Sequence, residues 1–166
     1  MDSQPRSLTQ RMTGAALLDV DTFEEVEADE TATGQAALVV VVVAACQAIG
    51  HWGSRSGMIT GALAALAGWA VWAGVTYLIG TRLFDGRATW GEVLRTLGFA
   101  QAPGVLAILG LLPLVRWGVG IVLPFWMLAA GIVGLRQALD ISTGKTVITA
   151  VLGWLAIAIP RIVLGW

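Results

Sequence analysis

The side chains of this sequence that could act in catalysis or bind a metal are few and widely separated. Cys46 and His51 are the single cysteine and the single histidine. A nucleophile with its base, or a metal cluster, needs its members within hydrogen-bond reach. His51 ends one apolar run, whereas Asp85, Glu92 and Asp140 fall in loops expected on the other side of a membrane. We therefore expect no catalytic residue, no metal, no cofactor and no enzyme activity.

Charged residues gather in an acidic N-terminal segment and in two polar loops, residues 81–95 and 136–145. These loops could recognise a partner, or they could form a solvated face that only sets the topology. We predict that the acidic segment docks on the arginines of the first loop through exposed ion pairs, each contributing about 0–1 kcal/mol. The predicted partner-binding residues are Glu24, Glu25, Glu27, Arg82, Asp85, Arg87, Glu92, Arg95, Arg136 and Lys145.

Long uncharged stretches separate these polar segments. The chain is 57% hydrophobic and 13% charged, and a helix needs about 20 largely apolar residues to cross a bilayer. The fifth stretch is long enough if Arg161 extends its head into the lipid headgroups. The sequence thus predicts an all-α integral membrane bundle of five transmembrane helices. The uncharged stretches are residues 31–54, 56–81, 96–115, 117–135 and 146–160.

The distribution of Arg and Lys predicts the orientation, because cytoplasmic loops carry their excess. Seven basic residues fall on the side of the N-terminus and three on the other side, which places the N-terminus in the cytoplasm and the C-terminus outside. The formal net charge of -1 favours no nucleic-acid partner. The seven are Arg6, Arg11, Arg82, Arg87, Arg95, Arg136 and Lys145, and the three are Arg55, Arg116 and Arg161.

We divide the chain into an acidic cytoplasmic tail, residues 1–30, and a transmembrane domain, residues 31–166. Thr22 and Glu25 fit a capping box, which predicts a short helix from Phe23 to about Glu30. This helix could be a solvated cap, or it could lie at the membrane interface with Phe23 and Val26 dipping into the headgroups.

Small residues recur at four-residue spacing in the second apolar stretch. Such spacing lets two helix backbones approach closely in a membrane. The contact could lie within the bundle or between two copies of the chain. The predicted packing residues are Gly57, Gly61, Ala64, Gly68 and Gly74.

Prolines predict kinks or breaks at Pro103, Pro113, Pro124 and Pro160, because each proline removes one backbone donor. Broken helices can line a transport path when polar groups lie at mid-depth. Here Gln47 and Gln101 are the polar groups available for such a path. A small transporter or permeation subunit is therefore an alternative function.

The order of several short segments resembles the Yip (Ypt-interacting protein) domain family in its prokaryotic form, from about Phe23 to the C-terminus. The resemblance implies a five-helix domain in a bacterial plasma membrane, with a cytoplasmic N-terminus. The segments that carry it are the acidic Phe-Glu-Glu at Phe23, Phe-Asp-Gly at Phe84, Leu-Arg-Thr-Leu-Gly-Phe-Ala-Gln-Ala-Pro ending at Pro103, Gly-Leu-Arg-Gln-Ala at Gly134 and Ser-Thr-Gly-Lys at Ser142.

Eukaryotic members of that family bind prenylated Rab-type GTPases, associate with one another and shape or traffic membranes. This chain has a short acidic tail and a single tyrosine, Tyr77, in place of the long N-terminal region and the Asp-Leu-Tyr-Gly-Pro motif of those proteins. Rab-type binding therefore does not carry over. We expect a non-enzymatic scaffold or adaptor for membrane organisation or a trafficking-like process, with the bilayer, other membrane proteins or further copies of the chain as partners.

The charge distribution makes a direct prediction about topology. A reporter fused to the N-terminus should lie in the cytoplasm, and one fused after Trp166 should lie outside, because the basic residues are biased seven to three. Reporter pairs that work only in one compartment, such as alkaline phosphatase and green fluorescent protein, measure this. Two termini on the same side would exclude five crossings.

Overall fold

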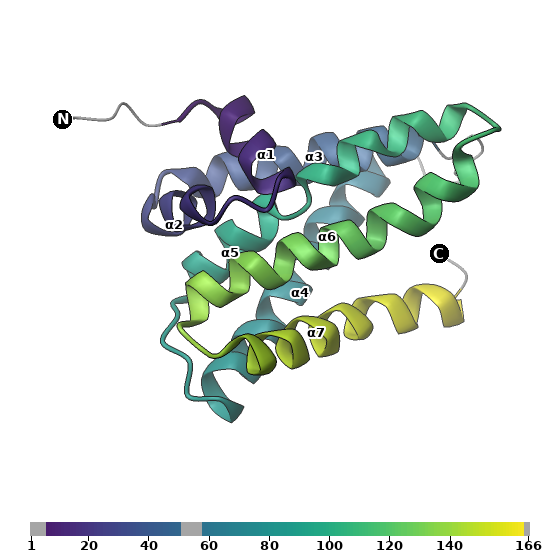
Figure 1. Cartoon of the computed structure of the whole chain (residues 1–166). Helices are drawn as coiled ribbons and strands as arrows, with labels where there is room; N and C mark the ends of the chain where they lie inside the picture. The colour runs from purple at the N-terminus through teal and green to yellow at the C-terminus, as the bar shows by residue number, and fades with distance from the viewer. Residues whose placement is uncertain (1–5, 51–57, 165–166) are drawn as a thin grey trace.

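The computed structural model describes residues 6–50 and 58–164, and the described part of the chain is built from helices. Two short helices, α1 and α2, precede a set of longer ones (Figure 1). The elements are α1 (Leu8–Ala16), α2 (Val20–Ala28), α3 (Ala32–Gly50), α4 (Met58–Leu83), α5 (Trp90–Phe99), the 3₁₀ helix η1 (Ala102–Leu111), α6 (Arg116–Leu139) and α7 (Thr143–Leu164).

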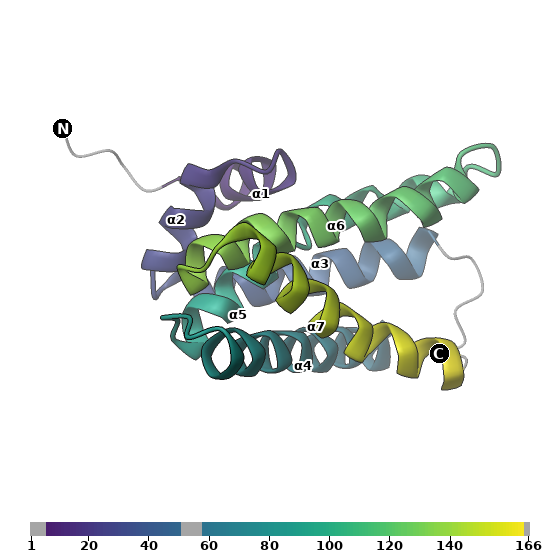
Figure 2. The ribbon, with the colours of Figure 1, turned by 60° about the horizontal axis from the view of Figure 1, so that its bottom comes forward.

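The long helices form one bundle whose two ends differ. At one end lie α2, the loop from α4 to α5 and the corner from α6 to α7, while the turn from η1 to α6 lies at the other end (Figure 1). We call the first of these the cap end. Turned by 60°, the bundle shows α7 crossing in front of α4 and α6 (Figure 2). The helix α1 lies along the outside of the bundle, against η1, α5 and α6.

Four segments of the described residues are long and apolar enough to cross a membrane: Ala32–Gly50, Ile59–Leu83, Trp90–Leu111 and Arg116–Leu139. They coincide with the first four predicted stretches. The helix α7 covers the fifth stretch but is not among these four segments. The structure thus supports a bundle with four candidate spans, and the fifth crossing stays a prediction.

The third span is broken where Pro103 was expected to break it. The α-helix α5 ends at Phe99, and η1 begins at Ala102 with the proline in its first turn. A 3₁₀ helix rises about 2.0 Å per residue and rarely exceeds four residues, so this ten-residue example is unusually long. Pro113 lies in the turn that follows η1, whereas Pro124 lies inside the continuous helix α6.

The N-terminal region differs from the prediction of one helix beginning at Phe23. It contains two helices, and α2 begins earlier, at Val20. The expected capping box at Thr22 is wrong, because Thr22 lies inside α2 and its hydroxyl donates to the Asp19 carboxylate at 2.6 Å. Capping boxes occur instead at the start of α1, from Ser7 and Gln10, and at the start of α5, from Thr89 and Glu92.

Glycines make the closest helix contacts, but not the glycines that the sequence pattern selected. A Cβ added at Gly98 would lie 2.7 Å from the Ala36 Cβ, and one at Gly104 would lie 2.5 Å from the Val43 Cγ1. These positions bring α5 and η1 against α3. Side chains larger than hydrogen would force the backbones apart, which is costly because interiors are already close-packed.

The expected packing residues of α4 lie in looser surroundings. No described atom lies within 4 Å of a Cβ built at Gly61, Ala64 is exposed, and a Cβ at Gly74 would meet the Trp90 ring at 3.3 Å. Gly68 lines a cavity, and Gly57 lies outside the described residues. Gly61 therefore meets no neighbouring helix among the described residues, and its role in helix packing stays a prediction.

This difference predicts the outcome of a matched pair of substitutions. Gly98→Leu should lower the free energy of unfolding by about 1–3 kcal/mol or more, because its side chain meets the backbone and Cβ of Ala36. Gly61→Leu should leave it nearly unchanged. Thermal unfolding of both variants in mild detergent measures this, and equal losses would place a second copy of the chain against Gly61.

Candidate functional site

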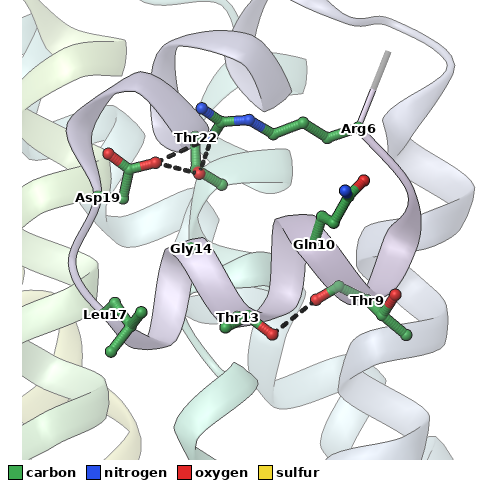
Figure 3. Close-up of a pocket in the computed structure, with 8 residues that line it drawn as sticks. All are labelled: Arg6, Thr9, Gln10, Thr13, Gly14, Leu17, Asp19 and Thr22. Carbon is green, nitrogen blue, oxygen red and sulfur yellow. Dashed lines mark hydrogen bonds and ion pairs between the residues drawn. The ribbon is translucent and has the colours of Figure 1, made fainter. Parts of the chain in front are cut away.

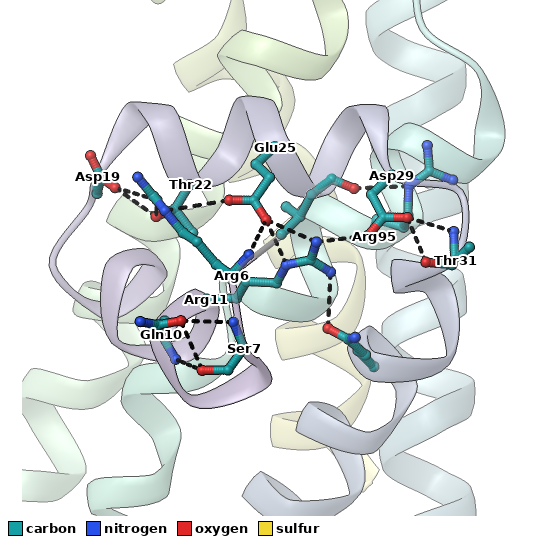
Figure 4. Close-up of polar contacts among 12 residues, drawn as sticks. Arg6, Ser7, Gln10, Arg11, Asp19, Thr22, Glu25, Asp29, Thr31 and Arg95 are labelled. Carbon is teal, nitrogen blue, oxygen red and sulfur yellow. Dashed lines mark hydrogen bonds and ion pairs between the residues drawn. The ribbon is translucent and has the colours of Figure 1, made fainter. Parts of the chain in front are cut away.

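Arg11 is a buried arginine that joins three helices. Its side chain is 2% exposed, and it donates from Nε and Nη2 to Glu25 Oε1 at 3.0 and 2.8 Å (Figure 4). Further bonds run from Nη2 to Asp29 Oδ2 at 2.7 Å and from Nη1 to Gln35 Oε1 at 3.0 Å. Removing one partner of a buried ion pair costs about 3–5 kcal/mol, because the other charge stays buried and unpaired. This contact therefore fixes α1 and α2 on the start of α3.

A second group of bonds closes the turn between α1 and α2. Arg6 donates to Asp19 Oδ2 at 2.9 Å and from its backbone to Glu25 Oε1 at 3.1 Å, and its guanidinium also meets Thr22 Oγ1. The hydrogen bond from Thr22, together with Arg6, holds the pKa of the Asp19 carboxyl below its usual value. An open groove runs between these residues and the exposed Thr9, Gln10 and Thr13 of α1 (Figure 3).

Arg95 connects α2 to the membrane domain. It is 5% exposed, and its Nε donates to the carbonyl oxygens of Val26 at 3.0 Å and Glu27 at 3.2 Å. These carbonyls lie at the C-terminal end of α2, where a cation is favoured by the helix dipole and by the unpaired carbonyls. Arg95 thus acts as the C-terminal cap of a helix that lies far from it in sequence.

Phe23 and Val26 anchor α2 by burial rather than by dipping into lipid. Both are 0% exposed, and a Cβ at Gly134 of α6 would lie 2.9 Å from the Phe23 ring. The interfacial position predicted for these two residues is therefore wrong. The exposed apolar residues of this region lie instead in the turn between α1 and α2, where Leu17 is 72% exposed. Trp126 of α6 holds this turn, since its Nε1 donates to the Ala16 carbonyl at 2.8 Å.

The two polar loops meet at the cap end. The backbone N–H of Arg87 donates to the Leu139 carbonyl at 3.0 Å, and Lys145 Nζ lies 3.5 Å from the Phe84 carbonyl and 5.8 Å from the Phe84 ring centre. The loop from α4 to α5 is thereby held against the corner from α6 to α7. The residues expected to share one surface do lie on neighbouring loops.

None of the ion pairs predicted between the acidic tail and Arg82, Arg87 or Arg95 is found among the described residues. Glu25 pairs with Arg6 and Arg11, not with Arg82 or Arg87, and Arg95 contacts backbone carbonyls of α2 instead of a carboxylate. Four ion pairs are found in the described part of the chain, and all four lie within residues 6–29. The exposed members of the predicted set are Glu24, Arg82, Asp85, Arg87, Arg136 and Lys145.

One feature of the sequence indicates that Arg11 is buried. Leu8, Met12 and Ala15 form one apolar face of α1, and Arg11 falls on that same face. A lone arginine on an apolar helix face indicates a buried partner. Its partners, 14 to 24 residues away, could not be inferred from spacing.

A cavity of about 330 Å³ opens inside the membrane bundle between α3, α4, α6 and α7. It is lined by Gln47 and Gln101, by Trp69, Trp72 and Trp154, and by Pro124. The two mid-depth amides and one proline of the predicted transport path therefore do converge.

The tryptophans near this cavity differ in their partners. Trp69 Nε1 donates to the Leu94 carbonyl at 2.9 Å, as expected for a mid-span indole. The buried Trp72 Nε1 has no hydrogen-bond partner among the described residues, and a Cβ at Gly153 would lie 3.1 Å from it. Trp72 therefore packs closely on α7 with its N–H unpaired.

Glu27 lies among like charges at the cap end, which predicts a pH effect. Burial, together with the negative charges of Glu92 and Asp140, raises the pKa of the Glu27 carboxyl from 4.5 to about 7. Between these values the folded chain holds a proton that the unfolded chain has released, so stability falls as the pH rises. Glu27→Gln should therefore unfold at a higher temperature than the unmodified chain near pH 8, and the gap should narrow toward pH 5.

Thermal unfolding in detergent across this range measures the gap. Glu30→Gln, at an exposed position just after α2, is the matched control and should follow the unmodified chain. A gap for Glu27→Gln that does not change with pH would show that this carboxyl is not shifted.

Comparison with known proteins identifies the family. A family model described as the Yip1 domain matches residues 17–164, which is most of the chain. No curated protein and no solved structure matches the chain significantly. The matched range begins just before α2 and runs through α7, so it includes the docked helix α2 as well as the membrane bundle. This protein is a multi-pass helical membrane protein that belongs to the Yip1 domain family.

Proposed function

We propose that this protein is a non-enzymatic membrane adaptor that presents the cap end to a partner in the cytoplasm. The observation that supports it is the fixed shape of this end. Arg11 and Arg95 are buried and hold α2 against the bundle, and the two polar loops are bonded to each other. A surface whose backbone is already held in place loses little conformational entropy when it binds a partner, and this favours recognition.

Contacts within the chain reduce the number of charged residues that could contact a partner. Glu25, Arg11 and Arg95 are occupied by contacts within the chain. Arg82, Arg87 and Lys145 are exposed, and they make no ion pair with the described residues. We propose that these three cations, with Asp85 beside them, contact the partner. They also fit the positive-inside pattern, which supports the proposal that the cap end faces the cytoplasm of a bacterial cell.

The alternative function, a small transporter, is favoured by one observation: Gln47, Gln101 and Pro124 line the same cavity. An uncharged substrate could use such a path. Flux of a small uncharged solute into liposomes that contain the purified protein tests this alternative directly.

Photo-crosslinking in intact cells tests the adaptor proposal. A crosslinking residue in place of Arg87 or Lys145 should give a discrete protein adduct, because both side chains are exposed at the cap end. Crosslinkers in place of Leu63 and Val71, exposed apolar residues of α4, are matched controls and should react with lipid. Arg82→Glu should lower the adduct yield.

An adduct between two copies of the chain would identify the partner as the protein itself. Adducts with lipid alone from the cap end, or the same proteins captured from Leu63 and Val71, would contradict the adaptor role.

A further inference from the structure

The wall of the membrane cavity is apolar, aromatic and uncharged. Trp69, Trp72 and Trp154 contribute three indole rings, and Val40, Val43 and Met127 contribute aliphatic and thioether surface. None of the described residues that line it carries a charge. An ion or a charged solute would therefore meet no counter-charge at this depth, which is strongly unfavourable.

The cavity lies deep in the bilayer. Its α3 residues, from Val40 to Gln47, come 8 to 15 residues after the start of that helix at Ala32. With a rise of about 1.5 Å per residue, they lie roughly 12–22 Å from the cap end of α3, within hydrocarbon that is about 30 Å thick. The occupant must be a molecule that is soluble in the bilayer.

Small residues border this volume from several helices. Ala44 of α3, Ala65 and Gly68 of α4 and Ala158 of α7 all line it. Small residues normally let membrane helices touch, but here they line the cavity. Water is a poor filling, because roughly ten molecules of about 30 Å³ each would face mostly indole and aliphatic walls.

Gln101 contributes a polar group to the wall that a ligand can contact. The side-chain amide of Gln101 makes no hydrogen bond with the described residues, and it lies where α5 gives way to η1. A polar group without a partner at this depth is costly. A hydroxyl or carbonyl oxygen on the occupant would satisfy it.

From these observations we propose that the cavity binds one uncharged lipid, whose hydroxyl or carbonyl oxygen hydrogen-bonds Gln101 while its apolar body packs on Trp69, Trp72 and Trp154. An isoprenoid or quinone-type ring lipid and a hydroxyl-bearing acyl lipid share this chemistry. The cavity shares no residue with the partner-binding set at the cap end, so the lipid proposal and the adaptor proposal are tested separately.

Retention of lipid by purified protein tests the proposal. The full chain is extracted from membranes in mild detergent, washed, and its bound lipids are identified by mass spectrometry. Ala65→Leu and Gly68→Leu fill the cavity and should abolish retention, whereas Ala64→Leu, on the neighbouring exposed position of α4, should retain the lipid as the unmodified chain does. Because a filling side chain occupies empty volume, the two cavity variants should unfold at or above the normal temperature in delipidating detergent.

A titration resolves the role of Gln101. The probes are a benzoquinone with a short alkyl tail and a long-chain primary alcohol, with tryptophan fluorescence as the readout. Gln101→Leu should weaken binding of both by about two- to tenfold, the effect of one uncharged hydrogen bond. Preference for the quinone or for the alcohol distinguishes the two kinds of lipid.

The proposal is overturned if the unmodified chain retains no lipid and binds neither probe. It is equally overturned if Ala65→Leu and Gly68→Leu, when folded, retain as much lipid as Ala64→Leu. Charged phospholipid retained in place of an uncharged lipid would also contradict it.

Discussion

Two buried guanidinium groups hold the N-terminal helices against the membrane domain, and the shape of the cap end depends on them. Arg11 binds carboxylates and an amide from α2 and α3, and Arg95 binds the carbonyls that end α2. Arginine suits both places because its planar fork donates several bonds at once and its charge is retained on burial. Without these contacts the acidic segment would be held by the burial of Phe23 and Val26 and by exposed ion pairs, which are weak and screened by salt.

The unusual third span determines how closely the rest of the bundle packs. The 3₁₀ helix η1 is longer per residue than an α-helix, and it packs along α3 and α6. Glycines at Gly50, Gly104 and Gly110 allow this approach, since a Cβ at each would collide with neighbouring atoms. Val43 and Met127, which meet Gly104 of η1, also line the membrane cavity, together with residues of α4 and α7. Tight packing and open volume thus lie next to each other in this bundle.

The cap end and the cavity are chemically different sites. The cap end is charged: Arg82, Arg87 and Lys145 make no ion pair with the described residues, and Glu27 lies under the influence of the carboxylates of Glu92 and Asp140. The cavity is uncharged and aromatic, with amides as its polar groups. A partner protein and a membrane lipid could therefore be bound at the same time, and each site can be altered by substitutions that leave the other intact.

The sequence alone determined the class of the protein, because a run of about 20 uncharged residues has few structural solutions outside a bilayer. It also located the break at Pro103, since a missing backbone donor acts locally. Tertiary structure decided the partners of Arg11 and Arg95, the burial of Phe23 and Val26, and which glycines touch a neighbour. These depend on segments far apart in the chain, such as Val26 and Arg95, which are separated by 69 positions in the sequence. A repeat such as Gly61 to Gly68 shows that a helix face is small, but only the arrangement of the neighbouring helices decides whether that face meets a backbone, a lipid or a cavity.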